Sequence, residues 1–169
     1  NSSESGTIVP SGIQVGLGVR TGSVYRIMTQ GDMNNTGNKL DVAIQGRGYF
    51  RVQLPSGQDA YTRAGNFQLS PEGQIVNSDG YTVAPGITIP PEATDITISK
   101  DGQVQVTIPN QTAPQIVGQL ELATFQNEAG LDPQGDNLFL ETAASGAPTT
   151  GAPASLGFGG LQQGFLETS

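Results

Sequence analysis

Residues 62–81, TRAGNFQLSPEGQIVNSDGY, bring an Arg, a Glu, an Asp, two Asn and two Gln close together in the chain. Such a set is typical either of a polar site or of the turns of a small sheet, because Asp, Asn and Gly are the residues that turns use. Arg63 and Asn66 are the least turn-like members, so they are candidate contact residues. An arginine here can tie a loop down through a carboxylate or backbone carbonyls, or reach a neighbouring chain.

The residue inventory limits the chemistry that this cluster could perform. The 169 residues include no Cys, His or Trp. This excludes a thiol nucleophile, an imidazole base, a Ser-His-Asp triad and a Cys/His zinc cluster. Carboxylates, hydroxyls, Lys39 and Lys100 remain, so a carboxylate-based hydrolase stays open. Without disulfides, stability comes from packing alone.

Two short motifs are weak candidates for ligand binding. GLGVRTG at 16–22 has the wrong spacing for a dinucleotide fingerprint, and no strand and helix surround it. LDPQGDN at 131–137 lacks the Asp-x-Asp-x-Asp-Gly ladder of a calcium loop. The sequence therefore predicts no cofactor and no metal.

Charge is distributed unevenly along the chain, whose net charge is −8. Residues 101–169 contain no Lys or Arg and seven carboxylates, of which Glu167 is the last. This disfavours nucleic acid and anionic membrane surfaces as partners, because both need basic residues. The acidic portion is interpreted as a soluble, self-repelling face, or alternatively as a surface that meets a basic partner or avoids adhering to a neighbour. No run of residues resembles a membrane span or a signal peptide.

Hydrophobic alternation, with no sustained helical stripe, predicts an all-β fold. Apolar residues at every second position define the expected strands, which are LDVAIQ, YFRVQL, DITIS, QVQVTI, GQLELATF and NLFLE. The 24 glycines and 11 prolines punctuate the chain at short intervals. We expect an irregular multi-hairpin β domain with short Gly-closed turns and extended terminal arms.

Four connections share one pattern, a three-residue loop that ends in Gly. They are Pro55-Ser56-Gly57, Pro71-Glu72-Gly73, Ser78-Asp79-Gly80 and Lys100-Asp101-Gly102. A three-residue loop at 100–102 places Ile98 opposite Val104 and Ile96 opposite Val106, which keeps both apolar rows on one face. The same arithmetic pairs Leu69 with Ile75, and Ile75 with Val83.

The ends differ in composition from the middle of the chain. Residues 1–23 are expected to form an extended arm and residues 24–142 the β-rich core. Residues 143–160, AASGAPTTGAPASLGFGG, hold few large apolar groups and are expected to form a loop or spacer. They belong to a Gly/Ala/Pro-rich return segment, 143–169. The chain starts at Asn1 without Met, so we expect an excised core.

Two stretches resemble a known family. Residues 38–83, from NKLDVAIQGRGYF to NSDGYTV, resemble the shared core motif of bacterial flagellar rod and hook proteins. GQLELATFQNEAGLDPQGDNLFLETAASGAP, continued by GFGGLQQGFLETS, resembles the C-terminal motif of that family. VPSGIQVGLGVR (9–20) is most similar to members from the distal part of the rod, with the proximal rod and the hook as alternatives.

The resemblance implies a structural protein without catalytic activity. Full-length members carry terminal helices that form the inner tube, so this chain would be the outer β-rich domain, with its return segment leading to a missing C-terminal helix. Implied partners are further copies in a helical polymer, other rod and hook subunits, and the P and L ring proteins. The implied location is the basal body, from periplasm to outer membrane, after type III export. We expect subunit contacts at Arg47, Arg63, Asn66 and the 1–20 arm.

Two other classes of protein remain as alternatives at this stage. A secreted β-rich binding module would show an exposed aromatic platform in a groove. A carboxylate hydrolase would show a deep cleft with two facing carboxylates.

Overall fold

The fold is taken from a computed structural model, which describes residues 30–168. The predicted arm at 1–23 lies outside the described residues. Within 30–168 the regular elements are strands and one short 3-10 turn, η2 (Glu128–Gly130). The all-β prediction is confirmed. No helix in this part of the chain is long and apolar enough to cross a membrane.

The strands are short, as the closely spaced Gly and Pro residues require. In chain order they are β1 (Met33–Asn35), β2 (Val42–Gln45), β3 (Phe50–Gln53), β4 (Asp59–Thr62), β5 (Gln68–Leu69), β6 (Ile75–Val76), β7 (Thr82–Val83), β8 (Asp95–Ile98), β9 (Gln103–Thr107), β10 (Gln115–Gln119), β11 (Leu122–Thr124), β12 (Asp132–Gly135), β13 (Leu138–Leu140), β14 (Thr149–Gly151), β15 (Gly160–Gln163) and β16 (Phe165–Glu167).

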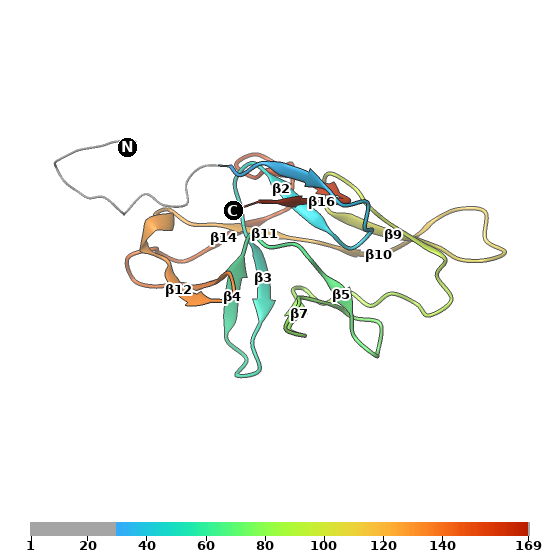
Figure 1. The fold of residues 1–169 in the computed structure, drawn as a ribbon, viewed down its shortest axis with the longest axis horizontal. Coiled ribbons are helices and arrows are strands. Elements are labelled where there is room, and N and C mark those ends of the chain that lie inside the picture. Colours follow the sequence, from blue (N-terminus) through green and yellow to red (C-terminus); the bar gives the residue numbers. More distant parts are fainter. Residues whose placement is uncertain (1–29, 169) are drawn as a thin grey trace.

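Among the described residues, these strands form one long sheet and four small ones. The long sheet has the order β12-β13-β4-β3-β7-β6-β5, and a second sheet has the order β10-β9-β8. The pairs β1-β16, β11-β14 and β15-β2 join segments that are far apart in sequence. In Figure 1, β3 and β4 descend from the middle of the molecule, while β2 and β16 lie along its upper side.

The predicted hairpin loops are confirmed. In each of the four hairpins the residue before the loop donates its N–H to the residue after it, at 2.8–3.0 Å. The closing glycines, Gly57, Gly73, Gly80 and Gly102, all have φ between 85° and 90°. Because this left-handed region is costly for residues with a Cβ, glycine fixes where each loop closes.

The predicted registers are confirmed as well. Ile96 faces Val106 and Ile98 faces Val104 across β8 and β9. Leu69 faces Ile75. Val76 faces Thr82, which is the register that aligns the preceding Ile75 with Val83. Keeping apolar rows on one face is therefore what set the strand alignment.

The main core lies where β2, β3, β6, β7, β8 and β9 turn their apolar faces toward one another. Its fully buried members include Val42, Ile44, Phe50, Val104 and Leu120. A second, aromatic cluster joins Tyr49, Tyr61 and Phe125. The rings of Tyr61 and Phe125 meet edge to face at 4.8 Å, which is a favoured aromatic geometry.

The segment 143–160, expected to be a loop, contains β14. This strand pairs with β11, with Thr150 opposite Ala123. Its residues TTG carry no alternating apolar pattern, so it is held by backbone pairing to a buried neighbour. Farther on, β15 pairs with β2 and β16 pairs with β1. Through β15 and β16 the return segment thus completes sheets that the first third of the chain begins.

Candidate functional site

Arg63 follows β4 and contacts a carboxylate from the other end of the chain. Its Nε donates to Glu167 Oε1 at 3.0 Å, and its Nη2 donates to Glu167 Oε2 at 3.1 Å. The two side chains are 25% and 12% exposed. Two parallel charge-assisted hydrogen bonds in a half-buried place form a strong, directional link.

Arg63 also binds the end of β2 and the loop between β2 and β3. Nη1 donates to the carbonyls of Gly46 and Gly48 at 2.6 and 3.0 Å. Nη2 also donates to the carbonyl of Ile44 at 3.1 Å. Gly46 and Gly48 have φ of 112° and 134°, so the loop turns its carbonyls toward one point through conformations that glycine tolerates. Arg63 is therefore engaged in the loop-tying arrangement, one of the two roles considered from the sequence.

Glu167 is bound not only by Arg63 but also by the residues that precede β1. Gln30 Nε2 and the Gly31 N–H donate to its Oε2 at 2.6 and 2.7 Å. Gln30 Oε1 in turn accepts the Gly46 N–H at 2.9 Å. A Cβ at Gly31 would lie 2.0 Å from the carbonyl oxygen of Thr168, so the close approach requires glycine. We call Gln30, Gly31, Arg63 and Glu167 the terminal clasp.

The structure brings Arg47 close to Arg63, while Asn66 has a separate environment. Arg47 lies between Gly46 and Gly48, whose carbonyls Arg63 binds. Its side chain is exposed and makes no ion pair within residues 30–168, whereas its carbonyl accepts the Gly159 N–H at 2.8 Å. Asn66 is exposed and forms an isolated backbone bridge with Asp41. The subunit contacts expected at Arg47, Arg63 and Asn66 stay predictions, and the 1–20 arm lies outside the described residues.

Gln163 is a further linking residue that sequence reasoning missed. Its Oε1 accepts the Ile98 N–H at 3.0 Å, and its Nε2 donates to the carbonyls of Ile96 and Lys39 at 3.0 and 2.8 Å. The amide side chain thus hydrogen-bonds to the backbone groups at the edge of β8, where another strand would otherwise pair. No local pattern marks a glutamine whose partners are 65 or more residues away.

The remaining polar residues of 62–81 act mainly in turns. Asn77 Oδ1 accepts the N–H groups of Asp79 and Tyr81 at 3.0 and 2.9 Å. Ser70 Oγ accepts the Gln74 N–H at 3.1 Å. These side-chain bonds to nearby backbone are what turn sequences use.

The side chains in this arrangement hold distant segments of the chain together through hydrogen bonds. Within residues 30–168, no group of three or more carboxylates is placed to hold a metal ion. Burial raises the pKa of Tyr61 above its ordinary value, with the nearby Asp59 charge adding to the effect. Tyr61 belongs to the aromatic cluster, so this shift reflects packing. The fold and the terminal clasp define a structural β domain.

Comparisons with known proteins agree with this class. The family model described as the flagellar hook protein FlgE/F/G D1 domain matches residues 43–106. The flagellar basal-body rod protein FlgG of Caulobacter vibrioides is 61% identical over 168 residues, covering 99% of this chain and 64% of that protein. FlgG of Agrobacterium fabrum is 50% identical over 162 residues, covering 96% of this chain and 62% of that protein.

A related rod protein, FlgF of Caulobacter vibrioides, is 36% identical over 150 residues, covering 86% of this chain and 56% of that protein. The chain thus spans somewhat less than two thirds of the length of these curated relatives. It belongs to the flagellar rod and hook protein family.

Proposed function

We propose that this chain is the outer β-rich domain of a structural subunit of the distal rod of the bacterial flagellar basal body. The observation that carries the proposal is the 61% identity to a basal-body rod protein, FlgG, over 99% of the chain. The lower identity to FlgF, 36%, favours this rod position over that of the other named rod protein. The proximal rod and the hook are the alternative positions.

In the proposed role, full-length subunits stack helically into a rigid hollow shaft that carries torque from the motor to the hook. Their partners are further copies, other rod and hook subunits, and the P and L ring proteins within which the shaft turns. The location is the basal body from periplasm to outer membrane, reached through the type III apparatus. The subunit has no catalytic role.

The terminal clasp supports a role in carrying mechanical force. β1 and β16 run antiparallel, with Met33 opposite Glu167, and the Thr168 N–H donates to the Asp32 carbonyl at 2.8 Å. Force that enters along this two-stranded ribbon passes through Glu167 to Arg63, and so to the body of the domain. Short loops closed by glycine and hydrogen-bonded at their bases limit bending elsewhere.

The acidic part of the chain is proposed to face outward, where charge would oppose adhesion to the rings. Asp101, Asp132, Asp136 and Glu141 are exposed, and the last three lie on or beside β12 and β13, at the left of Figure 1. The remaining three acidic residues make internal contacts. Glu121 lies 3.6 Å from Arg51, Glu128 accepts the Tyr49 hydroxyl, and Glu167 belongs to the terminal clasp.

Electron microscopy of basal bodies from the source bacterium lacking this gene tests the proposal. Rods that stop short and lack a hook would support a distal-rod subunit. Intact rods that lack only the hook would assign the protein to the hook. Normal basal bodies would overturn the proposal, and a strain carrying the gene on a plasmid serves as the control.

A further inference from the structure

Leu156 is presented at the tip of a well-held loop between β14 and β15. Its side chain is 100% exposed. Inside the loop, the Ala154 N–H donates to the Gly159 carbonyl at 2.7 Å, and the Phe158 N–H donates to Ser155 at 3.0 Å. A single exposed leucine is common on protein surfaces. The charged residues near Leu156 indicate a specific role for it.

Two cationic residues lie at the base of this loop. Gly159, through its N–H, donates to the carbonyl of Arg47 at 2.8 Å, and a Cβ at Gly160 would lie 2.8 Å from Cγ of Lys100. Both cationic side chains are exposed, and neither makes an ion pair within residues 30–168, whereas Lys39, Arg51 and Arg63 do. Asp101, beside Lys100, accepts the Ser99 hydroxyl in the same turn. We call Arg47, Lys100 and Leu156 the knob.

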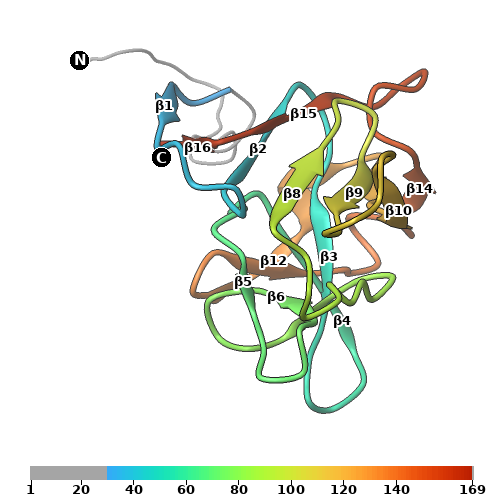
Figure 2. The ribbon, with the colours of Figure 1, turned by 90° about the vertical axis from the view of Figure 1, so that its right-hand side faces the viewer.

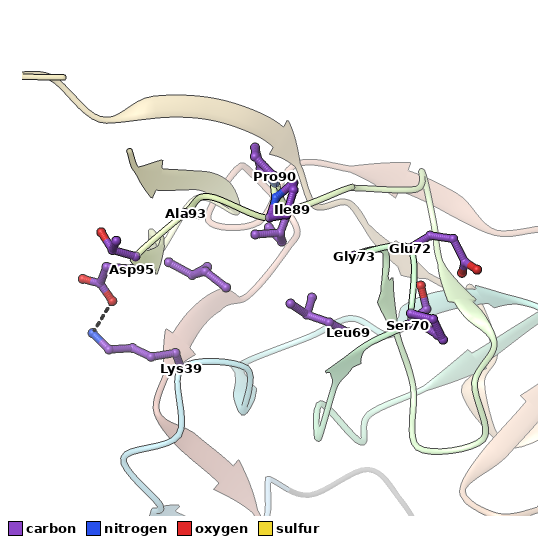
Figure 3. A pocket seen from close by; sticks show the side chains of 13 residues that line it. Lys39, Leu69, Ser70, Glu72, Gly73, Ile89, Pro90, Ala93 and Asp95 are labelled. Carbon is purple, nitrogen blue, oxygen red and sulfur yellow. Dashed lines mark ion pairs between the residues drawn. The ribbon is translucent and has the colours of Figure 1, made fainter. Parts of the chain in front are cut away.

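A groove of about 500 Å³ lies elsewhere, between the β5–β6 turn and the segment 89–96. Leu69, 40% exposed, points into it from below, and Ile89 and Pro90 face it from above (Figure 3). The Lys39–Asp95 ion pair, at 3.3 Å, marks one end, and Glu72 stands at the other.

The charges of the groove are opposite to those of the knob. Glu72 is exposed and has no ion pair within the described part of the chain, while Asp95, 47% exposed, shares its charge with Lys39. The residues that line the groove therefore carry one net negative charge, whereas the knob carries two cations, with the carboxylate of Asp101 beside Lys100. Such complementarity selects the partner and its orientation more than it adds affinity.

Knob and groove are at opposite ends of β8. The strand begins at Asp95, which lines the groove, and ends at Ile98, two residues before Lys100. In Figure 2, β5 lies on the left and the loop that follows β14 projects at the upper right. A copy of the domain therefore cannot place its own knob in its own groove.

We propose that Leu156 of one copy inserts into the Leu69–Pro90 groove of the next copy, with Arg47 and Lys100 facing Glu72 and Asp95. This contact rests on the proposed function, because it requires the protein to polymerise. It joins two different surfaces, so every added copy leaves one free knob and one free groove. A heterologous contact of this kind builds an open helical assembly.

Disulfide trapping tests the contact, because the chain contains no cysteine of its own. The full-length protein with Leu156→Cys and Leu69→Cys is expressed in the deletion strain, and its basal bodies are oxidised and run on a non-reducing gel. We expect a ladder that extends beyond the dimer. The matched control pairs Leu156→Cys with Ser56→Cys, at the tip of the β3–β4 loop and outside the groove, and should give no ladder.

The possible results distinguish a failure of the contact from a failure of the proposed function. Rods that form but show no ladder, or only a closed dimer, overturn the contact and leave the proposed function standing. If the parent protein, expressed in the same deletion strain, does not restore rods seen by electron microscopy, the proposed function and the contact both fail.

A charge exchange checks the pairing independently of the leucine. Adding Arg47→Glu to the double-cysteine variant should abolish its ladder, because a carboxylate at this position of the knob would face the carboxylate of Glu72. Adding Glu72→Arg as well should restore the ladder. Both side chains are exposed, so neither substitution threatens the fold. A ladder that persists with Arg47→Glu alone would contradict the proposed orientation.

Discussion

Arg63 and Glu167, 104 residues apart in sequence, are joined by two parallel hydrogen bonds of 3.0 and 3.1 Å. The pair connects the loop after β2 with both terminal strands. It is the point at which the two ends of the described chain are fixed to the body of the domain. We therefore expect the stability of the domain to depend on it.

Arg63→Ala should destabilise the domain by about 3 kcal/mol, because it leaves a largely buried carboxylate without its cation. It also leaves the carbonyls of Gly46 and Gly48 without donors. Urea unfolding of the 169-residue chain, followed by circular dichroism, measures the loss. Arg47→Ala is the matched control, since Arg47 is exposed and makes no ion pair among the described residues. It should change stability by less than about 0.5 kcal/mol. Equal losses in the two variants would contradict the role of the terminal clasp.

Gln163→Met should cost about 2 kcal/mol, because a side chain of similar length then leaves the Ile98 N–H and two carbonyls unpaired. The Ile98 amide should also lose hydrogen-exchange protection, since Gln163 Oε1 is its acceptor. Gln162→Met, at the preceding position of β15, is the control and should leave both properties nearly unchanged. Retained protection of Ile98 in Gln163→Met would show that the side chain does not cap β8.

Gly102→Ala and Gly57→Ala test how much a turn depends on its surroundings. Both glycines close three-residue loops, with φ of 87° and 90°. A Cβ at Gly57 would meet nothing within 4 Å, whereas a Cβ at Gly102 would lie 2.8 Å from Pro153 and 2.9 Å from the Leu120 carbonyl oxygen. Thermal unfolding should show a loss of about 1 kcal/mol at Gly57, from conformational strain alone, and about 3 kcal/mol at Gly102, where steric overlap adds to the strain. Similar losses would contradict the close packing around Gly102.

Tyr61 should make stability fall at alkaline pH. Burial raises its pKa in the folded state above the ordinary value of 10.0, so the folded protein keeps the phenolic proton after the unfolded chain has released it. The stability is therefore complete below pH 10 and is lost as the pH rises toward the folded-state pKa, with a slope of up to about 1.4 kcal/mol per pH unit.

Urea unfolding between pH 8 and pH 11, an interval of about three pH units around the tyrosine titration, measures this effect. Tyr61→Phe keeps the ring in the aromatic cluster but removes the ionisable hydroxyl. Its stability should fall less steeply above pH 10 than that of the parent chain. Parallel curves for the two proteins would exclude Tyr61 as the source of the alkaline loss.

The local architecture follows from the order of the residues alone. Alternating apolar residues define the strands, and the Gly-closed loops set the registers of Ile96 with Val106 and of Leu69 with Ile75. These features are predictable because a hairpin joins neighbours in sequence, so that loop length and the sidedness of a strand leave a single alignment. The same reasoning assigned the polar residues of 77–80 to a turn, and the residue inventory excluded whole classes of active site.

The way in which distant segments meet became visible only in the folded chain. β14 pairs with β11 although Thr149–Gly151 shows no strand pattern, because a buried strand such as Leu122–Thr124 needs a hydrogen-bonding neighbour whatever its side chains. Glu167 lies in the terminal clasp, although its position among residues without Lys or Arg suggested an outward acidic face. A cation 104 residues away compensates that carboxylate, and long-range pairing of this kind leaves no periodic signal in the sequence.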